Sequence, residues 1–304
     1  MTQTLDGRAP APRREPEVEQ PAEAMNRECS CSAVDLVQLR AELERAFVGG
    51  GLNLSLLETH PHLFSSLPVF VAPEQVRRMA SIIAAVEGVV ALPAYRERVL
   101  AWAPASARHD PGPLGAFLGY DFHVGEDGPQ LIEINTNAGG AMLNLLLARA
   151  QRACCAEVRS LAGGPADLLA VEDELVEMFR EESRRHGRTA PLRSIAIVDE
   201  RPMEQYLYPE FLLFQRLFER RGIAAVIADP RELEIRDGAL RAAGVPVDLA
   251  YNRLTDFGLD CPESAALRRA WLEGAAVVTP HPRAHALYAD KRNLSLLADA
   301  ALLE

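Results

Sequence analysis

Short apolar runs alternate with amphipathic helical segments from about residue 190 onward, and this alternation is the strongest constraint on the fold. The apolar runs are RSIAIVDE (193–200), IAAVIAD (223–229), VDLAYNR (247–253) and AAVVTP (275–280). The helical segments are YLYPEFLLFQRLFERRG (206–222) and PESAALRRAWLEG (262–274). Strands that are apolar on both faces and separated by helices are typical of a parallel sheet. We therefore predict an α/β fold with a parallel sheet over 189–284, and a small hairpin inside it at LEIRDGAL (233–240).

The first half of the chain has a different pattern. Helical spacing is found over 35–47, 72–90, 91–103 and 167–187, and GYDFHVGEDGPQLIEIN (119–135) predicts a β-hairpin around a Gly-Glu-Asp-Gly turn. We predict a disordered tail over 1–32, which is rich in Pro and Glu, then a helical region with the hairpin over 33–188. The last segment, 285–304, begins a further region.

Composition limits the classes of partner. A net charge of -11 and a sequence pI near 5.2 argue against a general nucleic-acid or anionic-membrane surface, and no apolar run is long enough to span a membrane. The N-terminus lacks the apolar core of a signal peptide, so a cytoplasmic protein is expected. The five cysteines lack zinc-site spacing, and we expect them to be reduced thiols.

The stretch LIEINTNAGG (131–140) contains the candidate metal-binding residues of the chain. Alternation along a strand places Glu133 and Asn135 on one face, with Ile132 and Ile134 facing a core; Asn137 joins the first face if the strand continues. Carboxylate and amide oxygens suit Mg²⁺, which takes its remaining ligands from water and phosphates. The alternative is an edge strand whose polar face meets water.

Three motifs in order along the chain resemble the eukaryotic-type glutathione synthetases, which are circularly permuted ATP-grasp ligases. They are the hairpin YDF…LIEINTNAGG, the strand LAYNRLTDF (249–257) and YADKRNLSLL (288–297), and the resemblance spans residues 110–304. The resemblance implies a partial ATP-grasp unit with a metal-binding hairpin, followed by an α/β substrate-binding domain. It also implies an ATP- and Mg²⁺-dependent reaction that joins a small carboxylate to an amine. Family members are often homodimers, so a homodimer is one of the expected states.

The resemblance assigns roles to individual residues. Glu133 and Asn135 match metal ligands, Lys291 matches a nucleotide-phosphate contact, and Arg253 matches a contact to a substrate carboxylate or phosphate. The same comparison places Asn137, Gln215 and Asp256 among the substrate-binding residues. Two alternatives remain open from the residues themselves: Lys291 as a solvated lysine before a helix, and Arg253 in an ion pair with Asp256.

The sequence also departs from the family pattern. Gly119 stands where the family has a substrate-binding arginine, and Asn137-Ala138-Gly139 replaces a serine-rich stretch, so substrates other than the glutathione precursors are expected. The family's glycine-rich phosphate loop, a further lysine and a further metal-binding carboxylate would follow the Lys291 segment, and they are not among these 304 residues. Two expectations follow: the N-terminal portion of a longer ligase, or a catalytically incomplete binding module with the same fold.

Other polar groups are weaker candidates. His281 and His285 are four residues apart, but Pro282 argues against a helix that would align them on a metal, so we expect loop histidines. Asp199, Glu200 and Glu204 follow the first parallel strand, where they would either recognise a substrate amine or lie in a solvated loop.

Overall fold

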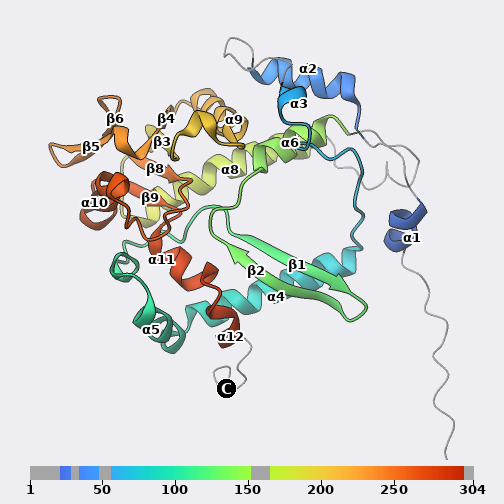
Figure 1. The fold of residues 1–304 in the computed structure, drawn as a ribbon, viewed down its shortest axis with the longest axis horizontal. Coiled ribbons are helices and arrows are strands. Elements are labelled where there is room, and N and C mark those ends of the chain that lie inside the picture. The colour runs from blue at the N-terminus through green and yellow to red at the C-terminus, as the bar shows by residue number, and fades with distance from the viewer. Residues whose placement is uncertain (1–20, 29–33, 48–55, 152–164, 298–304) are drawn as a thin grey trace, which may run out of the picture.

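A computed structural model of the chain describes residues 21–28, 34–47, 56–151 and 165–297. Its centre is a four-stranded sheet of β3 (Ser194–Val198), β4 (Ala224–Ala228), β8 (Leu249–Asn252) and β9 (Val277–Thr279). The strand order is β4-β3-β8-β9, and every pair is parallel. The prediction of a parallel α/β fold is therefore confirmed (Figure 1).

Helices cover both faces of this sheet, which explains why its strands are mostly apolar. In β3, Ile195 and Ile197 belong to one core cluster, with α8 (Pro165–Arg185) and α9 (Tyr208–Arg220). Ala196 and Val198 point the other way, into a second cluster with α10 (Ala265–Glu273). Because neighbouring side chains of a strand face opposite sides, a strand buried on both sides favours apolar residues at successive positions.

A small antiparallel sheet extends the second core. It contains β5 (Leu233–Arg236), β6 (Ala239–Ala242) and β7 (Val245–Pro246), in that order, and the hairpin predicted at 233–240 is its first half. Short 3₁₀-helical turns connect several of the larger elements in the described part of the chain: η1 (Ala105–Arg108), η2 (Pro202–Glu204), η3 (Pro230–Glu232) and η4 (Pro262–Ser264).

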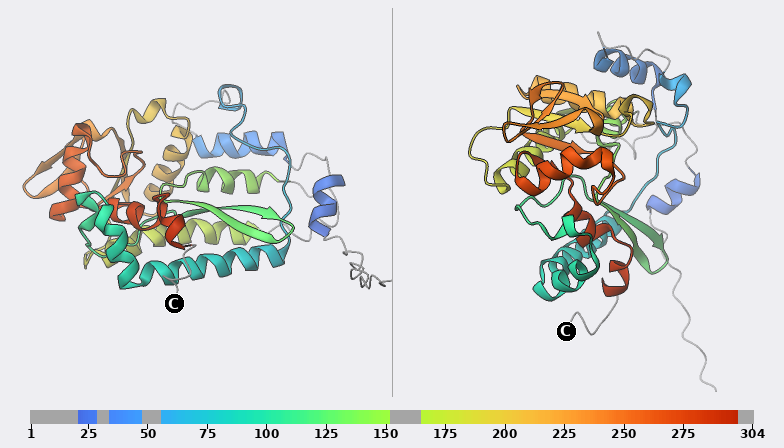
Figure 2. Two further views of the ribbon diagram at one scale, coloured as in Figure 1. Left: turned by 60° about the horizontal axis from the view of Figure 1, so that its bottom comes forward. Right: turned by 60° about the vertical axis from the view of Figure 1, so that its left-hand side comes forward.

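The N-terminal helices pack onto the first core cluster. α2 (Leu36–Phe47) and α6 (Ala141–Arg149) contact each other, and α6 also contacts α8 and α9. Figure 2 shows α2 and α6 lying side by side. α1 (Pro21–Glu28) is helical where a disordered tail was predicted; the other residues of that segment, 1–20 and 29–32, lie outside the described ranges. α3 (Leu56–Thr59) is a single turn.

The predicted hairpin is present and rests on a long helix. β1 (Gly119–Gly125) and β2 (Gly128–Asn135) are antiparallel, and they pack on α4 (Pro73–Ala91), which is followed by α5 (Pro93–Trp102). Figure 1 shows α4 running along the hairpin. Asp121 pairs with Glu133, but Phe122 pairs with Leu131, so Ile132 is an extra residue in β2.

This bulge corrects one expectation from strand alternation. Ile134 is 3% exposed and packs with α4, as expected, but Ile132 is 52% exposed. A bulge inverts the alternation beyond it. Leu131 therefore takes the core position that regular alternation gives to Ile132, and Leu131 packs against the same cluster as Ile134.

The chain returns to the hairpin after β9. α11 (Pro282–Ala284), the π-helical turn η5 (His285–Ala289) and α12 (Asn293–Leu297) follow one another, and η5 contacts both β2 and α5. The Tyr95 hydroxyl donates a hydrogen bond to the carbonyl of Leu287 at 2.9 Å, which fixes η5 on α5. Lys291 thus lies directly before a helix and beside the hairpin.

Among the described residues, no single helix is both long and apolar enough to cross a membrane. The bent pair α4 and α5, with an angle of 77° between them, meets the criteria of length and composition only when both helices are taken together.

Candidate functional site

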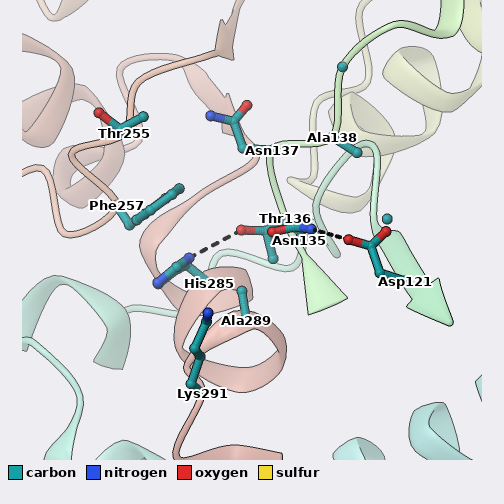
Figure 3. A pocket seen from close by; sticks show the side chains of 12 residues that line it. Asp121, Asn135, Thr136, Asn137, Ala138, Thr255, Phe257, His285, Ala289 and Lys291 are labelled. Atoms are coloured by element: carbon teal, nitrogen blue, oxygen red, sulfur yellow. Dashed lines mark hydrogen bonds between the residues drawn. The ribbon is translucent and has the colours of Figure 1, made fainter. Parts of the chain in front are cut away.

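A pocket of about 560 Å³ lies where the hairpin, the loop after β8 and the C-terminal turns meet (Figure 3). Three segments that are far apart in the sequence build it. The hairpin and the segment after it contribute Gly119, Asp121, Asn135, Thr136, Asn137, Ala138 and Gly139; the loop after β8 contributes Thr255 and Phe257; the turns contribute His285, Ala289 and Lys291. Of the predicted site residues, Asn135, Asn137 and Lys291 line this pocket.

Two carboxylates and an amide share one face of the hairpin beside the pocket. The amide nitrogen of Asn135 donates to Glu133 Oε1 and to Asp121 Oδ2, both at 3.2 Å. Glu133 and Asn135 therefore face the same side, as the alternation predicts. Asp121 joins them because it pairs with Glu133 across the hairpin. Asp121 was not among the predicted site residues, although it belongs to the hairpin motif YDF, which could have indicated it.

Lys291 completes this group with a positive charge. Its Nζ lies 3.4 Å from Glu133 Oε2. The hydrogen bond from Asn135 and the ammonium of Lys291 together lower the pKa of Glu133, so its carboxylate is ionised at neutral pH. The lysine side chain is 81% exposed. Solvent therefore screens the attraction between the two charges, and the ion pair is weak.

An aromatic pair forms the opposite side of the pocket. The rings of Phe257 and His285 stack with centroids 3.9 Å apart and an interplanar angle of 4°. The Nδ1 of His285 lies 3.3 Å from the hydroxyl of Thr136, which is buried (Figure 3). Burial lowers the pKa of His285, so the ring is neutral at neutral pH. The expectation of a loop histidine was wrong for His285, because η5 is a helical turn that begins at this residue.

Arg253 lies behind the pocket wall and does not line the pocket. It is 6% exposed, and its Nη1 donates to the carbonyls of Asn137 at 3.0 Å and Ala138 at 2.9 Å. The Asn137 amide nitrogen donates back to the carbonyl of Arg253 at 2.8 Å. Among the described residues, no carboxylate lies within ion-pair distance of Arg253, and its buried Nε has no hydrogen-bond partner. Arg253 therefore fixes the segment after β2, which carries part of the pocket wall.

Gly139 permits this close packing. A Cβ at this position would lie 2.8 Å from Arg253 Nη2 and 2.7 Å from Leu207 Cδ1. A larger residue would displace the guanidinium or the wall, which gives a physical reason for glycine at this point of the motif.

Gln215 and Asp256 do not line the pocket, although Asp256 stands between the lining residues Thr255 and Phe257. Gln215 is on α9, and its amide nitrogen donates to the carbonyl of Ala225 at 3.0 Å, so it joins α9 to β4. Asp256 accepts hydrogen bonds from the backbone of Asp260 and Cys261, at 2.9 and 3.0 Å, and it closes the loop after β8. The predicted alternative of an Arg253–Asp256 ion pair is absent from the described residues.

The residues that follow the parallel strands gather at one edge of the sheet. Burial raises the pKa of Asp199, after β3, to about 6. Asp229, after β4, is bonded to Arg231 through both carboxylate oxygens, at 2.8 and 2.7 Å. Glu200 and Glu204 are exposed beside Arg201, in the solvated arrangement that was the alternative to an amine site.

The hairpin face meets the chemical requirements of a Mg²⁺ site only in part. Asp121 and Glu133 supply hard oxygens on one surface, and Asn135 turns its amide nitrogen toward both of them. Of the two carboxylates, Glu133 pairs with the ammonium of Lys291. The described residues contain no group of three or more His, Cys, Asp or Glu side chains that could hold a metal ion. A cation on this face would therefore take most of its ligands from water and from a bound phosphate, as Mg²⁺ commonly does.

Sequence reasoning missed the aromatic wall. Phe257 and Thr255 belong to the quoted motif LAYNRLTDF, but their approach to His285 depends on how the C-terminal turns fold back. Four cysteines, Cys29, Cys31, Cys154 and Cys155, lie outside the described residues; Cys261 is exposed and not in a disulfide.

Comparison with known proteins gives no family assignment: no protein-family model matches the chain, and no curated protein matches it. The fold and the pocket therefore carry the functional argument.

Proposed function

We propose that this chain carries the metal- and phosphate-binding part of an ATP- and Mg²⁺-dependent carboxylate–amine ligase. One observation carries the proposal: the carboxylates and amide of the hairpin lie on the same side as the ammonium of Lys291, at the rim of one pocket. An anionic polyphosphate bound through a divalent cation needs both kinds of group within a few ångströms of each other.

The reaction of such a ligase has two steps. The γ-phosphoryl group of ATP passes to a substrate carboxylate oxygen, which gives ADP and an acyl phosphate. An amine nitrogen then attacks the acyl carbon, phosphate leaves, and the nitrogen loses a proton to give the amide. Bound Mg²⁺ would neutralise phosphate charge during the first step.

The chain's own residues have distinct tasks in this proposal. Glu133, Asn135 and Asp121 would hold the cation on the hairpin face. Lys291 would contact a phosphate oxygen, and the wall that includes Asn137 would position the substrate. Arg253 would act through that wall, because its guanidinium holds the carbonyls of Asn137 and Ala138. No nucleophilic side chain is required, because catalysis comes from positioning and charge neutralisation.

Calorimetric titration with ATP in excess Mg²⁺ tests the proposal. Wild-type protein is expected to bind Mg-ATP, and Glu133→Gln is expected to weaken binding at least about tenfold, because a hydrogen-bonded anionic ligand to the cation is lost. The matched control is Glu126→Gln, which removes the same charge from the exposed turn of the hairpin and should leave the affinity unchanged. Equal binding by all three proteins, or no binding by wild type, would overturn the proposal.

A second candidate is a binding module with the same fold that performs no phosphoryl transfer. The placement of Gln215 favours it, since this residue joins α9 to β4 instead of facing the pocket. Binding of Mg-ATP by calorimetry, without any release of ADP in the presence of candidate acids and amines, would favour the module.

A further inference from the structure

Both carboxylate oxygens of Glu133 are already engaged within the chain. Oε1 accepts a hydrogen bond from the Asn135 amide at 3.2 Å, and Oε2 lies 3.4 Å from Lys291 Nζ. The amide of Asn135 can rotate without leaving this face of the hairpin. The ammonium of Lys291, by contrast, places a full positive charge next to the carboxylate of Glu133. A divalent cation that binds Glu133 must therefore displace Lys291 or approach against its repulsion.

Lys291 is free to move away from Glu133. It lies in a turn, two residues before α12 begins at Asn293, and its side chain is 81% exposed. Among the described residues, no other carboxylate lies within ion-pair distance of this ammonium. A phosphate group in the pocket, which Lys291 lines, would offer it an alternative anionic partner.

We infer that Lys291 competes with the divalent cation for Glu133, and that a polyphosphate relieves this competition by binding the ammonium. Metal and polyphosphate would then bind cooperatively, and each would raise the affinity of the chain for the other. The inference rests on the proposed function, since it takes the hairpin face as the metal site. It adds a specific cause for coupling between the two ligands.

Binding of Mn²⁺ alone provides the first test, measured by electron paramagnetic resonance of the free ion at constant ionic strength. Lys291→Gln is expected to bind Mn²⁺ about three- to tenfold more tightly than wild type, because it removes both the competing partner and a positive charge near the cation. Lys291→Arg keeps the charge and should bind like wild type. Because the side chain is exposed, neither change should shift the thermal midpoint appreciably.

Arg292→Gln is the matched control. It removes the same charge from the next residue, but Arg292 pairs with Asp290 and lies over Trp102, not Glu133. Its Mn²⁺ affinity should stay close to that of wild type. Equal affinities in wild type and Lys291→Gln would overturn the inference while leaving the metal site in place, and so would an equal gain in Arg292→Gln. If neither wild type nor Lys291→Gln binds Mn²⁺ at millimolar concentration, the metal site itself fails, and with it the proposed function.

The reciprocal measurement uses inorganic tripolyphosphate in the presence of EDTA. Glu133→Gln releases Lys291 and should bind tripolyphosphate about threefold more tightly than wild type. Asp121→Asn removes a carboxylate from the same face without releasing the lysine, so its gain in affinity should be smaller. The gain should disappear when Glu133→Gln is combined with Lys291→Gln, because the double-mutant cycle isolates the contribution of the pair. A gain of the same size in the Lys291→Gln background would contradict the inference.

Discussion

His281 shows how one buried side chain can be held in a single tautomer. Its ring is 3% exposed and stacks on Trp271. The backbone N–H of Ala284 donates to Nδ1 at 3.1 Å, so Nδ1 carries no proton, and Nε2 lies 3.0 Å from the carbonyl of Pro113, to which it donates. A second proton would face the N–H of Ala284. Burial lowers the pKa of His281 to about 4, and the hydrogen bond to the carbonyl of Pro113 offsets only part of this effect.

The lowered pKa predicts a pH dependence of stability. The folded-state pKa lies below the ordinary histidine value of 6.5, so the unfolded chain binds more protons between the two values. His281 therefore makes its full contribution to the free energy of unfolding above pH 6.5. As the pH falls toward 4, the protein loses about 3 kcal/mol of this stability.

Urea denaturation at several pH values checks this prediction. The loss of stability between pH 6.5 and 4 should be smaller in His281→Gln than in wild type, although the variant is less stable at neutral pH. The difference between the two proteins is the relevant quantity, because carboxylates such as Asp229, whose pKa is lowered, also cost stability in acid. Parallel pH profiles would show that His281 does not titrate as described.

At the scale of the element, the bulge in β2 decides which residues of the hairpin are buried. Ile132 and Ile134 have the same side chain and are two positions apart, yet only Ile134 packs against α4. Ile134→Ala should lower the free energy of unfolding by about 2–5 kcal/mol, because it leaves a cavity in a packed cluster. Ile132→Ala should cost less than about 1 kcal/mol.

Chemical denaturation of both variants measures this contrast. Each is the control for the other, since both remove the same atoms from the same strand. Similar losses for the two variants would mean that the strand alternates regularly and that the bulge is absent in solution.

The sequence predicted the parallel sheet and the hairpin because their signals are local. Apolar runs of about five residues, a Gly-Glu-Asp-Gly turn, and glycines such as Gly222 and Gly274 after helices each act over a few positions. The bulge at Ile132 was not visible, because it depends on pairing between two strands. The metal-ligand proposal could be stated from Glu133 and Asn135, but the stacking of Phe257 on His285 joins segments that only the tertiary fold brings together.

At the scale of the whole molecule, the first core cluster crosses the boundary predicted at residue 188. It includes Leu39 from α2, Phe179 from α8 and Val277 from β9. Phe179 is fully buried and contacts the rings of Phe214 and Tyr251, which belong to α9 and β8. A helix that precedes the predicted boundary, α8, thus forms part of the core on one face of the sheet.

This shared core predicts that both faces of the sheet unfold together. Trp271 reports on the opposite face, where it is 1% exposed and donates to the carbonyl of Ser106 at 2.9 Å. Phe179→Ala should lower the free energy of unfolding by about 3–5 kcal/mol, and it should move the fluorescence transition of Trp271 as far as the far-ultraviolet circular dichroism transition. Coincident transitions are the standard test of a single cooperative unit.

The experiment is made in a Trp102→Phe background, so that Trp271 is the one remaining tryptophan of the sequence. Leu169→Ala, on an exposed part of the same helix, is the control and should change stability by less than about 1 kcal/mol. If Phe179→Ala shifts only the circular dichroism transition while Trp271 unfolds as before, the two faces are independent. The pocket, whose walls come from the hairpin and from the loop after β8, would then join two separately stable parts. In a single cooperative unit, by contrast, the walls keep their relative positions for as long as the sheet is folded.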